Sequence, residues 1–306
     1  MLTCDDYLSP RTLDEAFDAI DAHRGRFRLV AGATDILPWA REGRAGDVHI
    51  PVLIDVAGIP ELKTRDVSPG RARLGAATPF QRFLDDADLA RALPVLPRCA
   101  VWFADDQIRE SATVGGNLVN ASPAADGTPA LLTNNAVVEI ARRDNAALTR
   151  RTVPLSEFVT GPGKAAIGDD EILLSVTCEP TPGYGGAFEK VGHRRSLVIS
   201  TVCVAALVRM DESGRIFDDV RLAVGGIGPV PRRLAEVEVV LRSKPLDSSH
   251  LERAAGMAPS FVASRTRQEY RHEVVAGFMV RSLVNAARRA GADTSRLAPE
   301  LEATHA

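Results

Sequence analysis

SATVGGNLVNASPAADGTPALL, residues 111–132, is the most distinctive stretch of this sequence. Small and polar residues dominate it, and apolar segments flank it on both sides. Gly, Asn, Ser, Ala and Pro prevail from Glu110 to Thr128, so we predict one long irregular segment there. Irregular segments of that length inside a compact domain usually carry a function, and the apolar flanks argue against disorder.

The residue types within this stretch favour contact with an anionic ligand. Gly115 and Gly116 lack a Cβ, so the backbone could come close to a bulky group. Polar side chains that could bind a ligand stand around and after the glycines: Thr113, Asn117, Ser122 and Asp126. The alternative is a tight loop in which Asp126 caps a helix that starts near Pro129, and the residues alone leave both interpretations open.

A second stretch, LVAGATDI at residues 29–36, has the pattern of a strand, a small-residue turn and a helix. Such a turn presents backbone N–H groups at a helix N-terminus, where they can hold a phosphate. Gly32 would allow the turn, and the Thr34 hydroxyl could add a donor. The alternative is an ordinary connection in which Thr34 or Asp35 is the helix N-cap.

Hydrophobic periodicity around these stretches predicts the remaining organisation. Thr12 begins a helix whose apolar face carries Leu13, Ala16, Phe17 and Ile20. We expect strands at 27–31, 51–55, 73–76, 137–141, 202–208 and 220–224, and helices at 94–103, 233–241 and 265–290. The first part thus reads as a small βαβ lobe of roughly 55 residues, and the last part as an α+β region, with strands before helices.

Composition places the chain among ordinary globular proteins. Its 306 residues are 45% hydrophobic and 25% charged, with a net charge of −3, which excludes disorder and a disulfide scaffold. A pI of about 6.1 without a large basic block argues against nucleic acid as a partner. The N-terminus lacks the pattern of a signal peptide, and the most apolar run, 197–208, is too short to span a bilayer. We therefore expect a cytoplasmic protein.

Several motifs of known chemistry are missing from the sequence. The four cysteines form no CxxC pair, and the six histidines have no close metal-ligand spacing. There is no GxGxxG after a strand, no P-loop and no GxSxG. We therefore predict no metal site and no catalytic acid, base or nucleophile in this chain.

Taken together, the two stretches resemble the flavin-binding motifs of the FAD subunits of molybdenum hydroxylases, the xanthine dehydrogenase and carbon monoxide dehydrogenase family. AGATD at 31–35 is similar to the first motif, and residues 111–132 are similar to the second. FEK at 188–190 with Arg194 and Arg195, AVGGIGPVPR at 223–232, and Tyr270 with Arg271 continue the resemblance over essentially the whole chain.

The resemblance implies a fold and a set of cofactor-binding residues. The fold would be α+β, with a two-lobed PCMH-type FAD-binding domain at residues 1–178 (lobes about 1–56 and 57–178) and an α+β C-terminal domain at 179–306. Asp126 would bind the ribose or ribityl hydroxyls of noncovalent FAD, and Lys190 would lie near the flavin ring. The implied FAD-binding residues are Leu29, Val30, Ala31, Gly32, Ala33, Thr34, Asp35, Ile36, Phe103, Thr113, Gly115, Gly116, Asn117, Ser122, Asp126, Leu173 and Lys190.

One departure from the family pattern concerns the first motif, which commonly has two adjacent glycines. Ala33 replaces the second of them here. A methyl group limits the backbone conformations with positive φ, so close approach of a phosphate at residue 33 is the doubtful part of the motif.

The resemblance also implies a function. The chain would receive electrons from 2Fe–2S clusters on a small partner subunit and pass them to NAD, oxygen or a quinone. Molybdopterin would reside on a large partner subunit, where the substrate is oxidised. Two alternatives remain open: a self-contained FAD-dependent oxidoreductase that acts directly on a small molecule, and a non-enzymatic nucleotide-binding protein.

Overall fold

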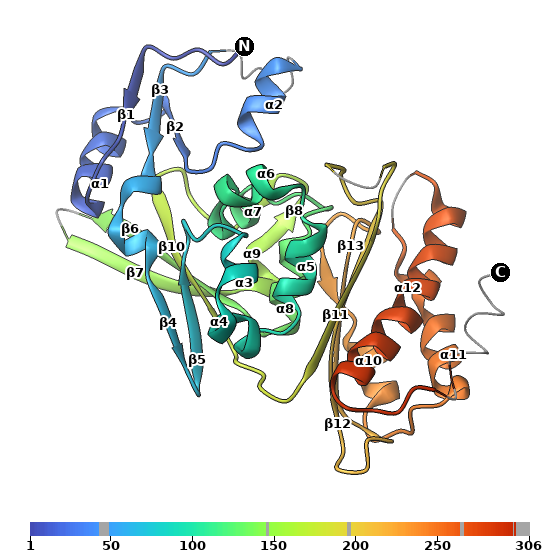
Figure 1. Ribbon diagram of the computed structural model, residues 1–306. Coiled ribbons are helices and arrows are strands. Elements are labelled where there is room, and N and C mark those ends of the chain that lie inside the picture. The colour runs from blue at the N-terminus through green and yellow to red at the C-terminus, as the bar shows by residue number, and fades with distance from the viewer. Residues whose placement is uncertain (43–48, 145–146, 195–196, 264–265, 296, 298–306) are drawn as a thin grey trace.

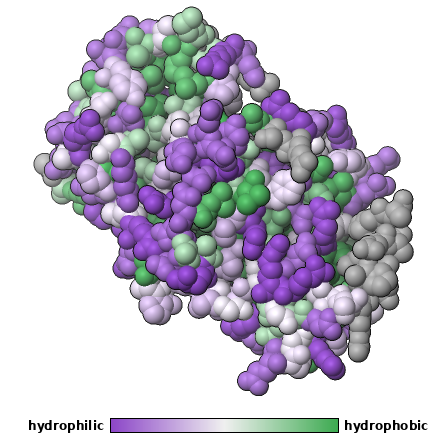
Figure 2. Space-filling model, in the orientation of Figure 1, coloured by the Kyte–Doolittle hydropathy of each residue, from purple (hydrophilic) through white to green (hydrophobic). Residues whose placement is uncertain are grey.

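Three main β-sheets follow one another along the chain in the computed structural model shown in Figure 1. The structure describes residues 1–42, 49–144, 147–194, 197–263, 266–295 and 297. Within these ranges, no helix is long and apolar enough to cross a membrane. Figure 2 shows the molecule in the orientation of Figure 1. The face turned to the viewer is mostly hydrophilic, and its hydrophobic residues gather over the N-terminal sheet and over the middle of the molecule.

The N-terminal lobe is a parallel sheet of strand order β1-β3-β2. Its elements are β1 (Asp6–Leu8), α1 (Leu13–Ala22), β2 (Phe27–Val30), α2 (Ile36–Arg41) and β3 (Val52–Asp55). The Thr12 hydroxyl accepts a hydrogen bond from the Glu15 N–H at the start of α1, and Leu13, Phe17 and Ile20 are buried beneath it. The predicted βαβ lobe and its N-cap are therefore confirmed.

The central region is an antiparallel sheet of order β4-β5-β10-β6-β7 with a group of short helices beside it. Its strands are β4 (Arg65–Ser68), β5 (Arg71–Gly75), β6 (Val137–Asp144), β7 (Ala147–Pro154) and β10 (Glu171–Cys178), with a small hairpin of β8 (Val159–Gly161) and β9 (Lys164–Ala165). Its helices are α3 (Arg82–Asp85), α4 (Ala87–Ala92), α5 (Leu96–Trp102), α6 (Asp106–Ser111), α7 (Val114–Val119), α8 (Gly127–Thr133) and α9 (Leu155–Phe158).

One prediction for this region was wrong. The segment from Glu110 to Thr128 is not irregular throughout, because it contains the end of α6, all of α7 and the start of α8. Each of these helices is only six or seven residues long. Such short helices, rich in glycine and alanine, leave no hydrophobic periodicity to detect.

The C-terminal region has strands first and helices later, as predicted. An antiparallel sheet contains β11 (Gly185–Val191), β12 (Val202–Met210), β13 (Phe217–Gly225) and β14 (Arg232–Arg233). Three helices follow, α10 (Ala235–Leu241), α11 (Ser248–Met257) and α12 (Gln268–Arg289). Figure 1 shows α12 along one face of this sheet and the central helices on the other, where α5 and α8 pack. Residues 264–265, at the predicted start of the last helix, lie outside the described residues.

Arg221 of β13 joins the C-terminal sheet to the central region. Its guanidinium donates two hydrogen bonds of 2.9 Å to the Glu179 carboxylate and one of 3.0 Å to Asp219. Only 9% of the Arg221 side chain is exposed. Burial alone would lower the pKa of Arg221, but the hydrogen bonds to Glu179 and Asp219 raise it above the ordinary value, so the cation is firmly retained.

We predict that Arg221→Ala destabilises the protein, because it opens a void at the junction and leaves Asp219 with only Arg242 and the Tyr184 hydroxyl as partners. Glu179 is half exposed and can be solvated, so the expected loss is about 2–3 kcal/mol, below the usual range for breaking a fully buried pair. Urea unfolding measures it. The matched control is Arg232→Ala, which breaks an exposed pair with Glu236 and should cost less than about 1 kcal/mol. Equal costs for the two variants would contradict a special role for Arg221.

Candidate functional site

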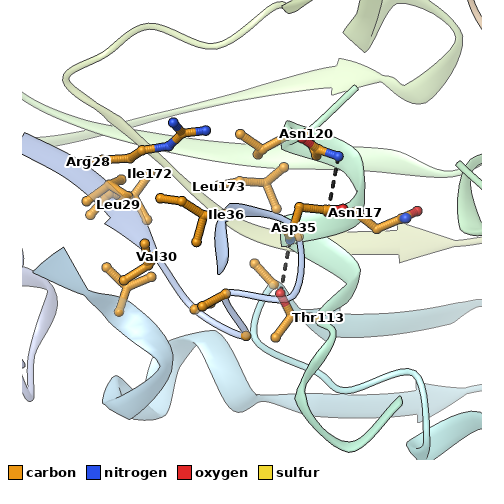
Figure 3. Close-up of a pocket in the computed structure, with 18 of the residues that line it drawn as sticks. Arg28, Leu29, Val30, Asp35, Ile36, Thr113, Asn117, Asn120, Ile172 and Leu173 are labelled. Carbon is orange, nitrogen blue, oxygen red and sulfur yellow. Dashed lines mark hydrogen bonds between the residues drawn. The ribbon is translucent and has the colours of Figure 1, made fainter. Parts of the chain in front are cut away.

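A cavity of about 630 Å³ lies where the N-terminal lobe meets the central region. Both stretches singled out in the sequence line it, as Figure 3 shows for several of their side chains. Fourteen of the residues predicted to bind a cofactor lie around this cavity: Leu29, Val30, Ala31, Gly32, Ala33, Thr34, Asp35, Ile36, Phe103, Thr113, Gly115, Gly116, Asn117 and Leu173. The volume is within the range of pockets that bury a small-molecule ligand.

The turn between β2 and α2 presents unpaired backbone donors to this cavity. Within the described part of the chain, the N–H groups of Gly32, Ala33, Thr34 and Asp35 have no hydrogen-bond acceptor. Successive free amides that precede a helix form a concave site for an anion such as a phosphate. A Cβ on Gly32 would lie 1.9 Å from the carbonyl oxygen of Ser111, so glycine is needed here to let the two stretches meet.

Ala33 adopts a left-handed backbone conformation, with φ of 52°. This conformation is disfavoured for residues with a side chain by about 1–2 kcal/mol. The turn is therefore formed in spite of the missing second glycine, and the strain at Ala33 is borne by the surrounding packing.

Asp35 occupies the N-cap position of α2, but its side chain makes no capping hydrogen bond. Instead, its carboxylate accepts a hydrogen bond of 3.1 Å from the Asn120 amide (Figure 3), which links the two stretches across the cavity. Burial raises the pKa of Asp35. Asp35 is therefore the N-cap residue by position, as the alternative interpretation has it, but it does not cap α2 through its side chain.

The second stretch offers side chains rather than backbone amides. The N–H groups of Val114, Gly115, Gly116 and Asn117 are all bonded within the protein, the third of them to the Thr113 hydroxyl. The Asn117 Oδ1 atom is buried and has no partner among the described residues. This oxygen lies close to Gly127, shielded from the cavity, so it is an unsatisfied acceptor of the protein interior at a cost of about 1–3 kcal/mol.

Glycine is needed at positions 115 and 116 for two different reasons. A Cβ on Gly115 would lie 2.7 Å from the Cβ of Ala76, so this glycine is required by packing within the protein. A Cβ on Gly116 would meet only the Thr113 hydroxyl oxygen within 4 Å. Because Gly116 lines the cavity, the space beyond it is available to a ligand.

Three of the predicted residues, Ser122, Asp126 and Lys190, do not line the cavity. Asp126 precedes α8 without capping it through its side chain. Its carboxylate instead pairs with the Lys190 ammonium at 2.5 Å and accepts a hydrogen bond of 2.5 Å from Ser200. Lys190 also donates to the Trp102 carbonyl, one residue before Phe103, so this polar cluster is joined to the chain beside a residue of the cavity wall.

Both charges of this cluster are almost fully buried, with side-chain exposures of 4% for Lys190 and 9% for Asp126. Burial raises the pKa of Asp126, while Lys190 and Ser200 act in the opposite direction. Burying such an ion pair costs desolvation free energy. Ionisable groups in these environments are found often at functional sites, so the pair is a candidate functional feature.

The sequence reasoning missed several residues of the cavity wall, above all Arg28, Trp39 and Asn120. Asn120 lies inside the quoted second stretch, so its amide was a detectable signal. Arg28 and Trp39 flank the first stretch, but nothing in their local pattern distinguishes a cavity wall from a protein surface.

Models of known protein families match nearly the whole chain. Residues 3–178 match the FAD binding domain in molybdopterin dehydrogenase, and residues 187–286 match the CO dehydrogenase flavoprotein C-terminal domain.

Individual proteins agree with these matches. The chain is 33% identical to the xanthine dehydrogenase FAD-binding subunit of Escherichia coli O157:H7, over 85% of this chain and 87% of that protein. It is 26% identical to the nicotine 6-hydroxylase medium subunit of Paenarthrobacter nicotinovorans, over 92% and 97% of the two chains. In fold, it matches a chain of the Hydrogenophaga pseudoflava carbon monoxide dehydrogenase that lacks the Mo-pyranopterin moiety, with a TM-score of 0.84, 23% identity, and coverage of 94% of this chain and 99% of that one.

We predict that Gly116→Val abolishes binding of FAD, the ligand named by the family model, because a branched side chain would fill the space beyond residue 116. The fold should persist at a cost of about 1–2 kcal/mol, because the new Cβ would lie 2.9 Å from the Thr113 hydroxyl oxygen and disturb the N-cap of α7. Flavin absorbance after gel filtration and thermal unfolding measure the two effects.

The contrasting variant is Gly32→Ala, whose Cβ overlaps the Ser111 carbonyl oxygen. It should lower the free energy of unfolding by about 1–3 kcal/mol even without ligand. Full flavin content in Gly116→Val would show that the ligand does not pass residue 116.

Proposed function

This chain belongs to the FAD-binding subunits of the molybdenum hydroxylase family, and we propose that it carries electrons from the 2Fe–2S clusters of a small partner subunit to an external acceptor. Substrate oxidation would take place at the molybdopterin of a large partner subunit. NAD, oxygen and a quinone are the candidate acceptors. The chain is thus an oxidoreductase component that binds FAD and needs no catalytic acid or base of its own.

The observation that carries this proposal is the row of four free amides at the turn from Gly32 to Asp35, in a cavity that Thr113 and Asn117 also line. The amides fit the negative charge of a diphosphate, and the polar residues Asn117 and Thr113, which line the same cavity, suit the hydroxyls next to it. When bound, FAD supplies the electron-transfer chemistry, and the protein supplies the binding geometry and the local charge. Neither stretch contains His or Cys, which supports noncovalent binding.

We assign the two halves of FAD as follows. The diphosphate would be held by Gly32–Ile36 with Thr113–Asn117, and the flavin ring would lie at the Phe103 end, toward Asp126 and Lys190. Leu29, Val30, Ala31 and Leu173 would provide apolar walls. Ser122, whose hydroxyl accepts a hydrogen bond of 3.3 Å from the Ala124 N–H, would keep the loop before Asp126 in place.

The domain organisation that goes with this proposal has two parts. Residues 1–178 would form the FAD-binding domain, with lobes of about 1–56 and 57–178, and residues 179–306 the C-terminal domain. Lys190 and Ser200 belong to the second part and Asp126 to the first, so the ring end of the site would lie at the domain junction.

We predict that the purified chain, free of iron and molybdenum, does not oxidise the substrate of the assembly. Candidate substrates are xanthine, nicotine and carbon monoxide, which the names of the relatives and the matched structure suggest. Anaerobic addition of each should leave the flavin absorbance unchanged, and bleaching should begin only when both partner subunits are added.

Two outcomes discriminate between the open alternatives. Reduction of a dye by NADH through the isolated chain would identify NAD as the acceptor. Catalytic reduction of the flavin by a small organic substrate, without partners, would replace the partner proposal with a self-contained oxidoreductase.

We further predict that Lys190→Met lowers the reduction potential of bound FAD at mildly alkaline pH. Removing the ammonium leaves the Asp126 carboxylate, whose negative charge disfavours added electrons. The shift should be on the order of 30 mV for each 1.4 kcal/mol of lost stabilisation of a two-electron couple. Dye-coupled redox titration measures it, with flavin content and thermal unfolding as checks on folding.

The matched control is the double variant Asp126→Asn with Lys190→Met, which removes both charges and leaves none buried and unpaired. Its potential should return close to that of the wild type. A single variant with full flavin content and an unshifted potential would show that the Lys190 charge does not act on the flavin.

A further inference from the structure

The cavity has two ends with different chemistry. The free amides lie in the Gly32 turn, and the Asp126–Lys190 cluster is joined to the chain next to Phe103 through the Trp102 carbonyl. Figure 3 shows Arg28, Leu29 and Ile172 together on one side of this turn, with Thr113, Asn117 and Asn120 on the other. If the diphosphate occupies the turn and the flavin ring the Phe103 end, the end near Arg28 is left for the adenosine half.

The wall at this second end is flat and aromatic. Trp39 of α2 and Arg28 of β2 both line the cavity, and the guanidinium carbon of Arg28 lies 5.9 Å from the centre of the Trp39 ring. Both side chains are only partly buried, and the side chains of Leu29 and Ile172 add apolar surface. Cation–π contact with Arg28 holds the tryptophan ring in one orientation.

Charge at this end also suits a neutral ring. The Glu171 carboxylate, which lines the cavity, is neutralised by Arg151 in a two-bond contact of 2.6 and 2.7 Å. The Arg28 guanidinium contacts the face of Trp39, and Asp169 is the other acidic residue of this segment that lines the cavity. A planar, uncharged heterocycle matches an aromatic wall with apolar neighbours better than a phosphate or a sugar does.

We infer that Trp39, backed by Arg28, packs against the adenine ring of FAD and makes the site select FAD over FMN. This inference rests on the proposed placement of FAD in the cavity. It assigns to α2 a role that the amides before it cannot fill, because amides that bind phosphates do not recognise the adenine attached to them.

Tryptophan fluorescence tests the contact without altering Trp39. The chain has two tryptophans, so the Trp102→Phe variant leaves Trp39 as the single reporter. ADP, which carries adenine and a diphosphate but no flavin, should quench this emission in the FAD-free protein, and inorganic pyrophosphate should not. Unchanged emission at ADP concentrations that displace FAD would overturn the inference.

Affinity measurements provide the second test. Trp39→Ala should weaken FAD binding about tenfold, the usual effect of losing one base–aromatic stack, and leave FMN binding unchanged. The matched control is Leu37→Ala, since Leu37 is exposed on the same helix and does not line the cavity. It should alter neither affinity.

The outcomes separate this inference from the proposed function. Equal FAD affinity in wild type and Trp39→Ala, or equal losses for FAD and FMN, would overturn the role of Trp39 while FAD binding stands. A wild-type chain that binds no FAD would instead contradict the proposed function.

Discussion

The buried pair between Asp126 and Lys190 ties the central region to the C-terminal sheet, and the surrounding structure depends on it. Taking these two charges out of water is costly unless every polar atom near them is bonded. Ser200 supplies one such bond to Asp126, the Trp102 carbonyl accepts another from Lys190, and the Cys99 thiol donates to the Asp126 carbonyl at 3.3 Å. A loop of the C-terminal sheet completes the junction through the Gly226 N–H, which donates to the Pro123 carbonyl.

Most of the fold could be predicted from local patterns. The helix after Thr12 and the strands at 27–31 and 202–208 have strong apolar periodicity, and the structure contains α1, β2 and β12 there. The segment 110–128 could not be predicted in the same way. Its helices are too short for a period of 3.6 residues to repeat: α7 buries only Val114 and Leu118 as an apolar face, and the Thr113 cap and the contact of Gly115 with Ala76 add to its stability.

The site was predictable where its chemistry is local in sequence. The Gly32 turn is a contiguous stretch, so its anion-binding character could be read directly. The contacts of Asp35 with Asn120 and of Asp126 with Lys190 join residues far apart in the chain, and only the resemblance to a family drew attention to Lys190. The packing role of Gly115 could not be predicted from the sequence either. Its contact with Ala76 requires glycine there whether or not a ligand binds.

The partners of Asp126 come from a later part of the chain, and this has a consequence for folding during synthesis. Lys190 and Ser200 lie more than sixty residues after Asp126 in the chain, and β12 needs β13 beside it to form its sheet. While the chain leaves the ribosome, the N-terminal lobe and the Gly32 turn can therefore fold early, as N-terminal units generally do. The Asp126 carboxylate stays solvated until the C-terminal sheet has been synthesised. Closure of the junction is then a late event of maturation, and nascent chains that stop before β13 cannot complete it.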